Sequence, residues 1–162
     1  MRSAILAFLV CALAAILEGW AAGGGVKTRF AQLRLPPLSP PFVLWIGIGL
    51  GYYAMCFFIL WRLLTTPIAS PTVRLGLALL GALMLANAAW GLFFFRLRNL
   101  RLSFLAFPPY VLLTLALEVV LLGVDRLAAL IMLPYLLYLI YATWWGYRVW
   151  RLNDSVTLGP AA

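Results

Sequence analysis

Five long apolar segments constrain this chain more than any other feature of its sequence. With 66% hydrophobic and only 10% charged residues, the chain has too little charge to cover a surface in water. An α-helix needs roughly 20 apolar residues to cross a bilayer, and it satisfies its own backbone hydrogen bonds in lipid. We therefore predict an all-α integral membrane protein, a single five-transmembrane-helix bundle over residues 1–153 with a flexible tail at 154–162. The five predicted helices cover about residues 3–24, 41–63, 72–95, 104–123 and 127–149.

The first apolar segment has two interpretations. Arg2, the apolar core and the small residues after it are also typical of a secretory signal peptide. Glu18 and Trp20, however, lie where a cleavage site normally carries small, uncharged residues. We expect a retained first helix, with cleavage as the alternative.

The net charge of +8 indicates membrane topology rather than nucleic-acid binding, because the basic residues lie at the ends of the apolar segments. Five helices place the two termini on opposite sides of the membrane. Four basic residues gather on one side: Arg2, Arg62, Arg74 and Arg126. Eight gather on the other: Lys27, Arg29, Arg34, Arg96, Arg98, Arg101, Arg148 and Arg151. Since basic residues concentrate in cytoplasmic loops, we expect a multi-pass protein with a cytoplasmic C-terminus and no nucleic-acid partner.

The residue types that usually carry metal or acid–base chemistry are scarce. The chain has no histidine, which removes the commonest zinc ligand, haem ligand and general base. Cys11 and Cys56 lie inside different apolar segments and are expected to behave as small buried hydrophobes. We predict no metal site, no catalytic residue and no required cofactor.

The longest polar interval, residues 23–41, combines three glycines with a proline-rich end. Such composition predicts a loop. Because loops of this length in compact proteins are often lids or binding loops, we interpret it as a binding loop, and a plain tether is the alternative. Just after it, Gly47 and Gly51 have the small-xxx-small spacing that lets membrane helices approach closely, and we expect close packing there.

Glu118 lies midway along the fourth segment, where an ionisable group is costly unless it faces protein or a wet cavity. Thr114 lies one turn earlier on the same face and could form a hydrogen bond with it. We regard Glu118 as a possible proton site, and a neutral, hydrogen-bonded acid is the alternative.

Three segments each present a helical face that mixes aromatic with small or polar residues. Such faces serve helix packing more often than ligand binding, although a flat apolar ligand would fill the same gaps. The second segment contributes Trp45, Gly49, Tyr53 and Cys56. The third contributes Leu83, Asn87, Trp90 and Phe94, and the fifth contributes Tyr138, Ala142, Trp145 and Val149.

The last segment resembles the final helix of the translocator protein family, also called tryptophan-rich sensory proteins (TspO), which typically reads PYLAWxxFATxLNxxxWRLN. This chain reads PYLLYLIYATWWGYRVWRLN from Pro134 to Asn153 in the same register. Asn87, Trp90 and the Phe94-Phe95 pair match the family's third-helix signature. The resemblance covers about residues 40–153.

The resemblance implies a bundle of five helices, commonly a homodimer, in a membrane that we expect to be bacterial. It also implies a ligand pocket enclosed by the helices and the first loop, with a porphyrin or haem as candidate ligand and a sterol-like lipid as a further candidate. We predict that this pocket contains the aromatic faces, in particular Trp45, Gly49, Tyr53, Asn87, Trp90, Phe94, Tyr138, Ala142 and Trp145. Tyr147 and Arg151 resemble the remnant of a sterol motif, a weak pattern.

The chain also departs from the family pattern. Two family tryptophans of the second helix align with Val43 and Gly49, and the asparagine of the last helix aligns with Gly146. We interpret the chain as a divergent member and predict a receptor- or transporter-like protein that binds a flat hydrophobic ligand. The alternatives are a tetrapyrrole-degrading enzyme, a proton-coupled transporter that uses Glu118, and a membrane assembly subunit without a ligand.

Overall fold

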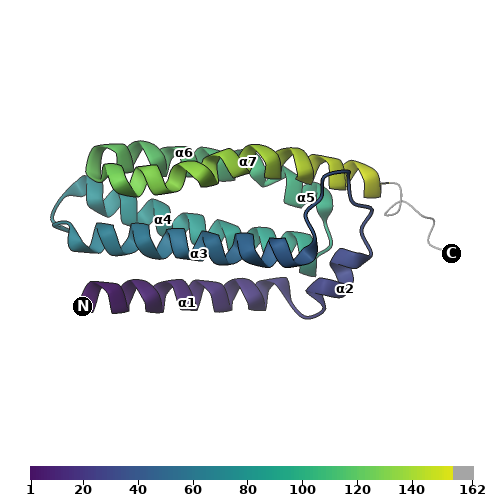
Figure 1. Cartoon of the computed structure of the whole chain (residues 1–162), viewed down its shortest axis with the longest axis horizontal. Coiled ribbons are helices and arrows are strands. Elements are labelled where there is room, and N and C mark those ends of the chain that lie inside the picture. The colour runs from purple at the N-terminus through teal and green to yellow at the C-terminus, as the bar shows by residue number, and fades with distance from the viewer. Residues whose placement is uncertain (155–162) are drawn as a thin grey trace.

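The computed structural model of the chain describes residues 1–154, so the predicted flexible tail lies outside the described residues except for Asp154. Five long helices run side by side along the molecule, with two short helices at one end (Figure 1). The elements in chain order are α1 (Arg2–Ala22), α2 (Val26–Ala31), α3 (Phe42–Thr65), α4 (Pro71–Gly91), η1 (Leu92–Arg96), α5 (Leu100–Leu105), α6 (Phe107–Val124) and α7 (Arg126–Asn153).

The five long helical stretches of residues 1–154 are each long and apolar enough to cross a membrane. They confirm the predicted fold class, an all-α membrane protein of five spanning helices. Proline lacks an N–H group and fits a helix's first turn, and α4 begins at Pro71 in this way. Pro41 precedes α3, and Pro108 and Pro109 lie in the first turn of α6.

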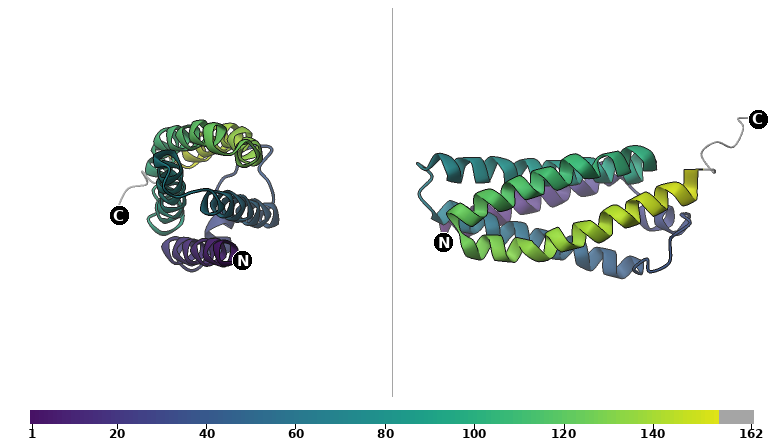
Figure 2. Two further views of the ribbon diagram at one scale, coloured as in Figure 1. Left: turned by 90° about the vertical axis from the view of Figure 1, so that its left-hand side faces the viewer. Right: turned by 90° about the horizontal axis from the view of Figure 1, so that it is seen from above.

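The helices close into a ring around a common axis, as the end view in Figure 2 shows. Contacts run in the order α1, α4, α6, α7, α3 and back to α1. The order in space therefore differs from the order in sequence, and it places α3, α4 and α7 around one interior. These are the helices that carry the three aromatic faces.

Two groups of buried side chains fill opposite ends of the ring. An aliphatic core that includes Ile59, Leu80, Leu117 and Met132 lies where α3 ends and α7 begins. An aromatic cluster at the other end consists of Phe30, Phe94, Trp145 and Val149, with partly buried aromatic neighbours. Cys11 and Cys56 are buried free thiols, as predicted. The space between the two groups contains the cavities described below.

The structure differs from the sequence-based expectations in its local detail. The interval 23–41 contains a helix, α2, which begins after Gly23 and Gly25, both at positive φ (74° and 78°). The prediction of close helix packing at Gly47 and Gly51 is wrong within the monomer. Both glycines are exposed, and a Cβ atom at either would meet nothing within 4 Å. In the absence of a neighbouring helix, the small spacing of these glycines has no partner inside this bundle.

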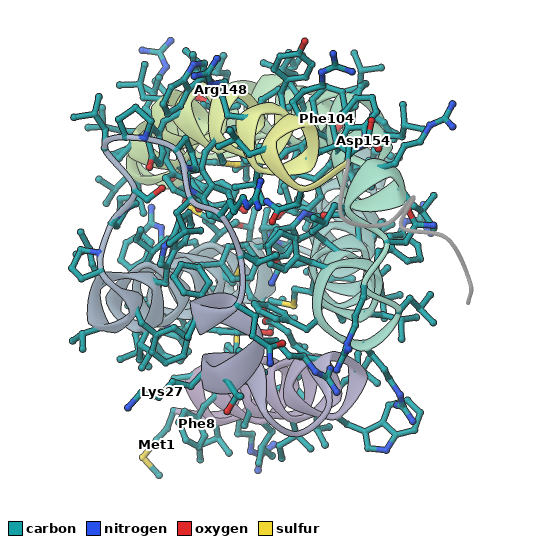
Figure 3. All side chains as sticks on the ribbon, turned by 90° about the vertical axis from the view of Figure 1, so that its right-hand side faces the viewer. Met1, Phe8, Lys27, Phe104, Arg148 and Asp154 are labelled. Carbon is teal, nitrogen blue, oxygen red and sulfur yellow. The ribbon has the colours of Figure 1, made fainter. Side chains whose placement is uncertain are left out.

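The basic residues separate between the two ends of the bundle as the sequence predicts. Arg62 and Arg126 lie where α3 ends and α7 begins, whereas Arg96 and Arg101 lie in η1 and α5 at the opposite end. Figure 3 views this opposite end, where Lys27 and Arg148 lie on the outer surface. The two ends of the molecule therefore differ strongly in charge.

Candidate functional site

Two neighbouring cavities lie inside the helix ring. The first, of about 260 Å³, is enclosed mainly by α4, α6 and α7. The second, of about 290 Å³, is lined by residues of α1, α2, α3, α4, η1 and α7. Six residues line both: Trp45, Asn87, Trp90, Tyr135, Tyr138 and Trp145. Because the same side chains form walls of both, the two cavities are adjacent lobes of one interior.

Most of the predicted ligand-binding residues meet at these lobes. Of the nine, eight line at least one lobe: Trp45, Gly49, Asn87, Trp90, Phe94, Tyr138, Ala142 and Trp145. Ala142 faces the first cavity, and Gly49 faces the second. Tyr53 lines neither, since its hydroxyl group is engaged by a carboxylate of α1. The three helical faces thus converge on one interior, as the family resemblance implies.

Trp145 is the centre of the aromatic wall. Its side chain is 2% exposed, and its ring lies 4.7 Å from that of Trp45 and stacks on Phe30 at 6.3 Å. Its indole Nε1 donates a hydrogen bond to Ser39 Oγ at 2.9 Å. The large side chain that replaces the family's usual smaller one is therefore packed and hydrogen-bonded, and it lines both lobes.

A π-helical turn places three successive phenylalanines around the two cavities. In η1 the amide of Leu97 bonds to the carbonyl of Leu92, five residues earlier. This wider turn fans the side chains out: Phe93 lines the first cavity, whereas Phe94 and Phe95 line the second. Such turns occur frequently at functional sites. In a regular α-helix only Phe94 of the three would lie on the same face as Asn87 and Trp90, which is the face that the sequence predicts.

Two indole N–H groups at the cavities have no acceptor. The Nε1 atoms of Trp45 and Trp90 are buried and, among the described residues, have no hydrogen-bond partner. Both side chains line both lobes. A buried donor without an acceptor costs free energy, so native structures seldom leave one unpaired. A ligand that carries an acceptor would satisfy these groups.

The second cavity also contains a carboxylate, that of Glu18. Glu18 Oε2 accepts hydrogen bonds from Tyr53 Oη at 2.6 Å and from Asn87 Nδ2 at 2.9 Å. The interaction joins α1, α3 and α4. Glu18 is not among the site residues predicted from the sequence. The signal was present, since an ionisable residue inside a membrane helix is a functional candidate by default.

The floor of the lobes is formed by tyrosines that the aromatic periodicity did not single out. Tyr110 of α6 and Tyr135 of α7 share a hydrogen bond of 2.6 Å between their hydroxyl oxygens. Both line the first cavity, and Tyr135 also lines the second. Tyr110 could not be assigned from sequence because its position depends on which helix lies opposite α7.

The first loop covers the cavities at the arginine-rich end. Val26 and Phe30 of α2 line the second lobe. The loop is held by Asn153, whose side chain accepts from the Arg34 amide and donates to the Arg34 carbonyl, both at 3.0 Å. Tyr141 Oη donates to the carbonyl of Leu38 at 3.0 Å. The loop is therefore fastened to α7 rather than hanging free between α1 and α3.

The other predicted residues lie away from the lobes. Glu118 is buried with Oε2 unpaired among the described residues, and it lines neither cavity. The predicted hydrogen bond with Thr114 is wrong: Thr114 Oγ1 donates to the Tyr110 carbonyl at 2.8 Å, because that carbonyl lies one turn earlier on the same helix. Glu118 as a proton site stays a prediction.

The predicted sterol-motif remnant lies on the outside of the bundle. Tyr147 is 44% exposed and its ring packs on Phe104 of α5 at 5.5 Å. The Arg151 guanidinium carbon lies 5.9 Å from the centroid of the Trp150 ring. Neither residue lines the two cavities. Within residues 1–154, no group of three or more His, Cys, Asp or Glu residues could hold a metal ion.

Comparison with known proteins gives a family match. No curated protein matches the chain significantly. The pattern of the TspO/MBR family matches residues 7–151, which is nearly the whole chain and includes all five long helices in whole or in large part. Together with the five-helix membrane fold, this match shows that the chain belongs to the TspO/MBR family.

Proposed function

We propose that this protein binds a flat hydrophobic ligand, a porphyrin or related tetrapyrrole, in the two lobes between its helices. Family membership supports a receptor- or transporter-like role in the membrane. The observation that carries the ligand proposal is the aromatic interior with the unpaired indole N–H groups of Trp45 and Trp90. Aromatic walls suit a planar ring system, and a porphyrin's carboxylates are acceptors for the indoles.

The size of the lobes adds a condition to this proposal. Ligand pockets usually measure about 300–1,000 Å³, and each lobe lies just below that range. A tetrapyrrole would therefore occupy both lobes together. The shared wall of Trp45 and Trp145 would have to shift for this, which predicts a ligand-induced change in tryptophan fluorescence. A sterol-like lipid is the alternative occupant of the same interior.

Titration of the purified protein with protoporphyrin, followed by tryptophan quenching, tests the proposal. Ala142 is 5% exposed and lines the first cavity, so Ala142→Phe should fill the lobe and weaken binding at least tenfold, about 1.4 kcal/mol. Ala116→Phe is the matched control, because Ala116 is exposed on α6 and lines neither cavity. Absence of saturable binding in the wild type, or equal affinity in the two variants, would overturn the proposal.

We further propose that the protein is a homodimer in a bacterial membrane with its C-terminus in the cytoplasm. The eight basic residues at the end formed by α2 and α5 support this orientation. Leu97, between η1 and α5, is 56% exposed. Leu97→Cys should react with a membrane-impermeant maleimide only after the cells are opened. Reaction in intact cells would reverse the orientation.

A further inference from the structure

We propose that the second cavity binds a flat aromatic cation, whose protonated nitrogen pairs with the Glu18 carboxylate. The inference rests on the proposed function in treating this cavity as a ligand site, and it adds a second ligand class to it. Three observations carry it: the engagement of the carboxylate, the absence of a cationic partner among the described residues, and the aromatic walls.

The Glu18 carboxylate is held in place through only one of its two oxygen atoms. Tyr53 and Asn87 both donate to Oε2, whereas no described residue donates a hydrogen bond to Oε1. Two donors from different helices fix the carboxylate at the cavity wall. Glu18 Cγ also lies against Gly91 of α4, where a Cβ atom would meet it at 3.8 Å. The remaining oxygen is a fixed acceptor within the reach of a bound molecule.

No basic side chain of the described residues forms an ion pair with Glu18. Two arginines of the loop end are engaged with backbone carbonyls: Arg29 with those of Ala22 and Phe95, and Arg96 with that of Trp20. An ion pair among the described residues joins Arg62 to Asp125 at the other end of the bundle. A carboxylate inside a membrane helix normally faces a charge partner or a wet cavity, and here the cavity offers the place for a cation.

The walls around the carboxylate favour the same ligand. Trp45, Trp90, Phe94, Phe95 and Tyr138 line the cavity with it. The faces of aromatic rings attract cations, and aromatic cages are a common means of recognising ammonium groups. The cavity of about 290 Å³ suits a molecule of about three fused rings without any movement of Trp45 or Trp145, unlike a tetrapyrrole. The size and the charge therefore point to a smaller cationic ligand.

A purely structural role for Glu18 predicts a different outcome. If the side chain only joined α1 to α3 and α4, a glutamine would serve equally well, because its carbonyl oxygen accepts the same two hydrogen bonds. Only a cationic ligand would bind differently to the charged glutamate and to the neutral glutamine at this position. Glu18→Gln is thus the informative variant, and Glu118→Gln is its matched control, since Glu118 is the other membrane-helix glutamate and lines neither cavity.

The experiment uses the full-length protein in nanodiscs of phosphatidylcholine, a lipid without net charge. Proflavine, a three-ring aromatic cation near neutral pH, is titrated by calorimetry, and acridine serves as its uncharged analogue. A charge-assisted hydrogen bond contributes about 1.5–3 kcal/mol, so we expect proflavine to bind at least tenfold more tightly than acridine. Glu18→Gln should remove that preference, whereas Glu118→Gln should retain it.

The outcomes separate this inference from the proposed function. Equal affinity for proflavine and acridine in the wild type would overturn it, and this comparison needs no variant to fold. An unchanged preference in Glu18→Gln would overturn it as well. Protoporphyrin is titrated in parallel, and retained porphyrin binding in Glu18→Gln shows that the variant folds. If the wild type prefers proflavine but does not bind protoporphyrin, the proposed function is contradicted and the cation site is not.

Discussion

At the scale of single residues, Asp125 shows how one side chain can organise a turn. It is the N-cap of α7, and its Oδ1 accepts from the amides of Leu127 and Ala128 at 3.1 and 3.2 Å. Its Oδ2 lies 2.6 Å from Arg62 Nε of α3. The hydrogen bond from Arg62, with the backbone hydrogen bonds, lowers the pKa of the Asp125 carboxyl group below its ordinary value.

This lowered pKa gives a pH-dependent prediction. The pKa of Asp125 in the folded protein lies below its unfolded value of about 3.9. The ionised carboxylate therefore stabilises the fold at any pH above about 3.9, and this contribution is lost as the pH falls through the folded-state pKa. Asp125→Asn should lower the melting temperature in detergent at neutral pH, and the difference should vanish in acid. Asparagine keeps the cap whereas alanine does not, so Asp125→Ala should cost about 1 kcal/mol more. Equal melting temperatures of the two variants would contradict the capping role.

At the scale of elements, the first loop and the end of α7 form one unit. Asn153 holds both backbone groups of Arg34, while Leu38, held at φ 68°, offers its carbonyl to Tyr141. A non-glycine residue in this left-handed region costs of order 1–3 kcal/mol, so the surrounding contacts must stabilise it. The WRLN end of the last helix therefore has a structural role in this chain, which is to fasten the loop over the cavities.

We predict that Asn153→Ala releases this loop. The variant loses both hydrogen bonds to Arg34, so trypsin should cleave after Arg34 several-fold faster than in the wild type, because proteolysis follows the population of the open form. Asn99→Ala is the control. Its side chain caps α5 at the same end by accepting from Leu102, and it makes no contact with the loop among the described hydrogen bonds. Mass spectrometry of the fragments measures the rates, and equal rates at Arg34 in the two variants would exclude the fastening role.

At the scale of the whole molecule, sequence and structure agree on what hydropathy determines. The five spans and the charge difference between the ends follow from segment length and from the positions of Lys and Arg. Helical periodicity placed the nine predicted residues on three faces, the family resemblance implied a pocket between them, and eight of the nine line the cavities. These features depend on spacing along one helix, which a sequence displays directly.

The rest depended on which helices become neighbours. Glu18 joins the site because α1 packs against both α3 and α4, and no pattern within α1 indicates that choice. Tyr53 faces Glu18 rather than the cavity for the same reason. The π-helical turn that redirects Phe93 and Phe95 lies in a stretch that reads as ordinary apolar helix. Contacts between helices, not propensities within them, decided these positions.

The exposed glycines of α3 give the final prediction, which concerns the proposed homodimer. Gly47 and Gly51 lie one turn apart with Val43, which is 77% exposed, and together they form an open small-residue face on the outside of the bundle. Such faces let the backbones of two membrane helices approach closely. If a second copy packs there, replacing both glycines by leucine should convert dimers in nanodiscs to monomers, as counted by single-molecule photobleaching.

The control for this prediction is Gly81→Leu on α4, where a Cβ atom likewise meets nothing within 4 Å. That glycine is also exposed, so the control applies the same type of substitution, at one position, to a different outer face. The cavities do not include Gly47 or Gly51, and porphyrin binding should therefore persist in the monomer. If the double variant stays dimeric, the dimer interface lies on another face of the ring. If it loses porphyrin binding together with the dimer, the pocket needs the second copy.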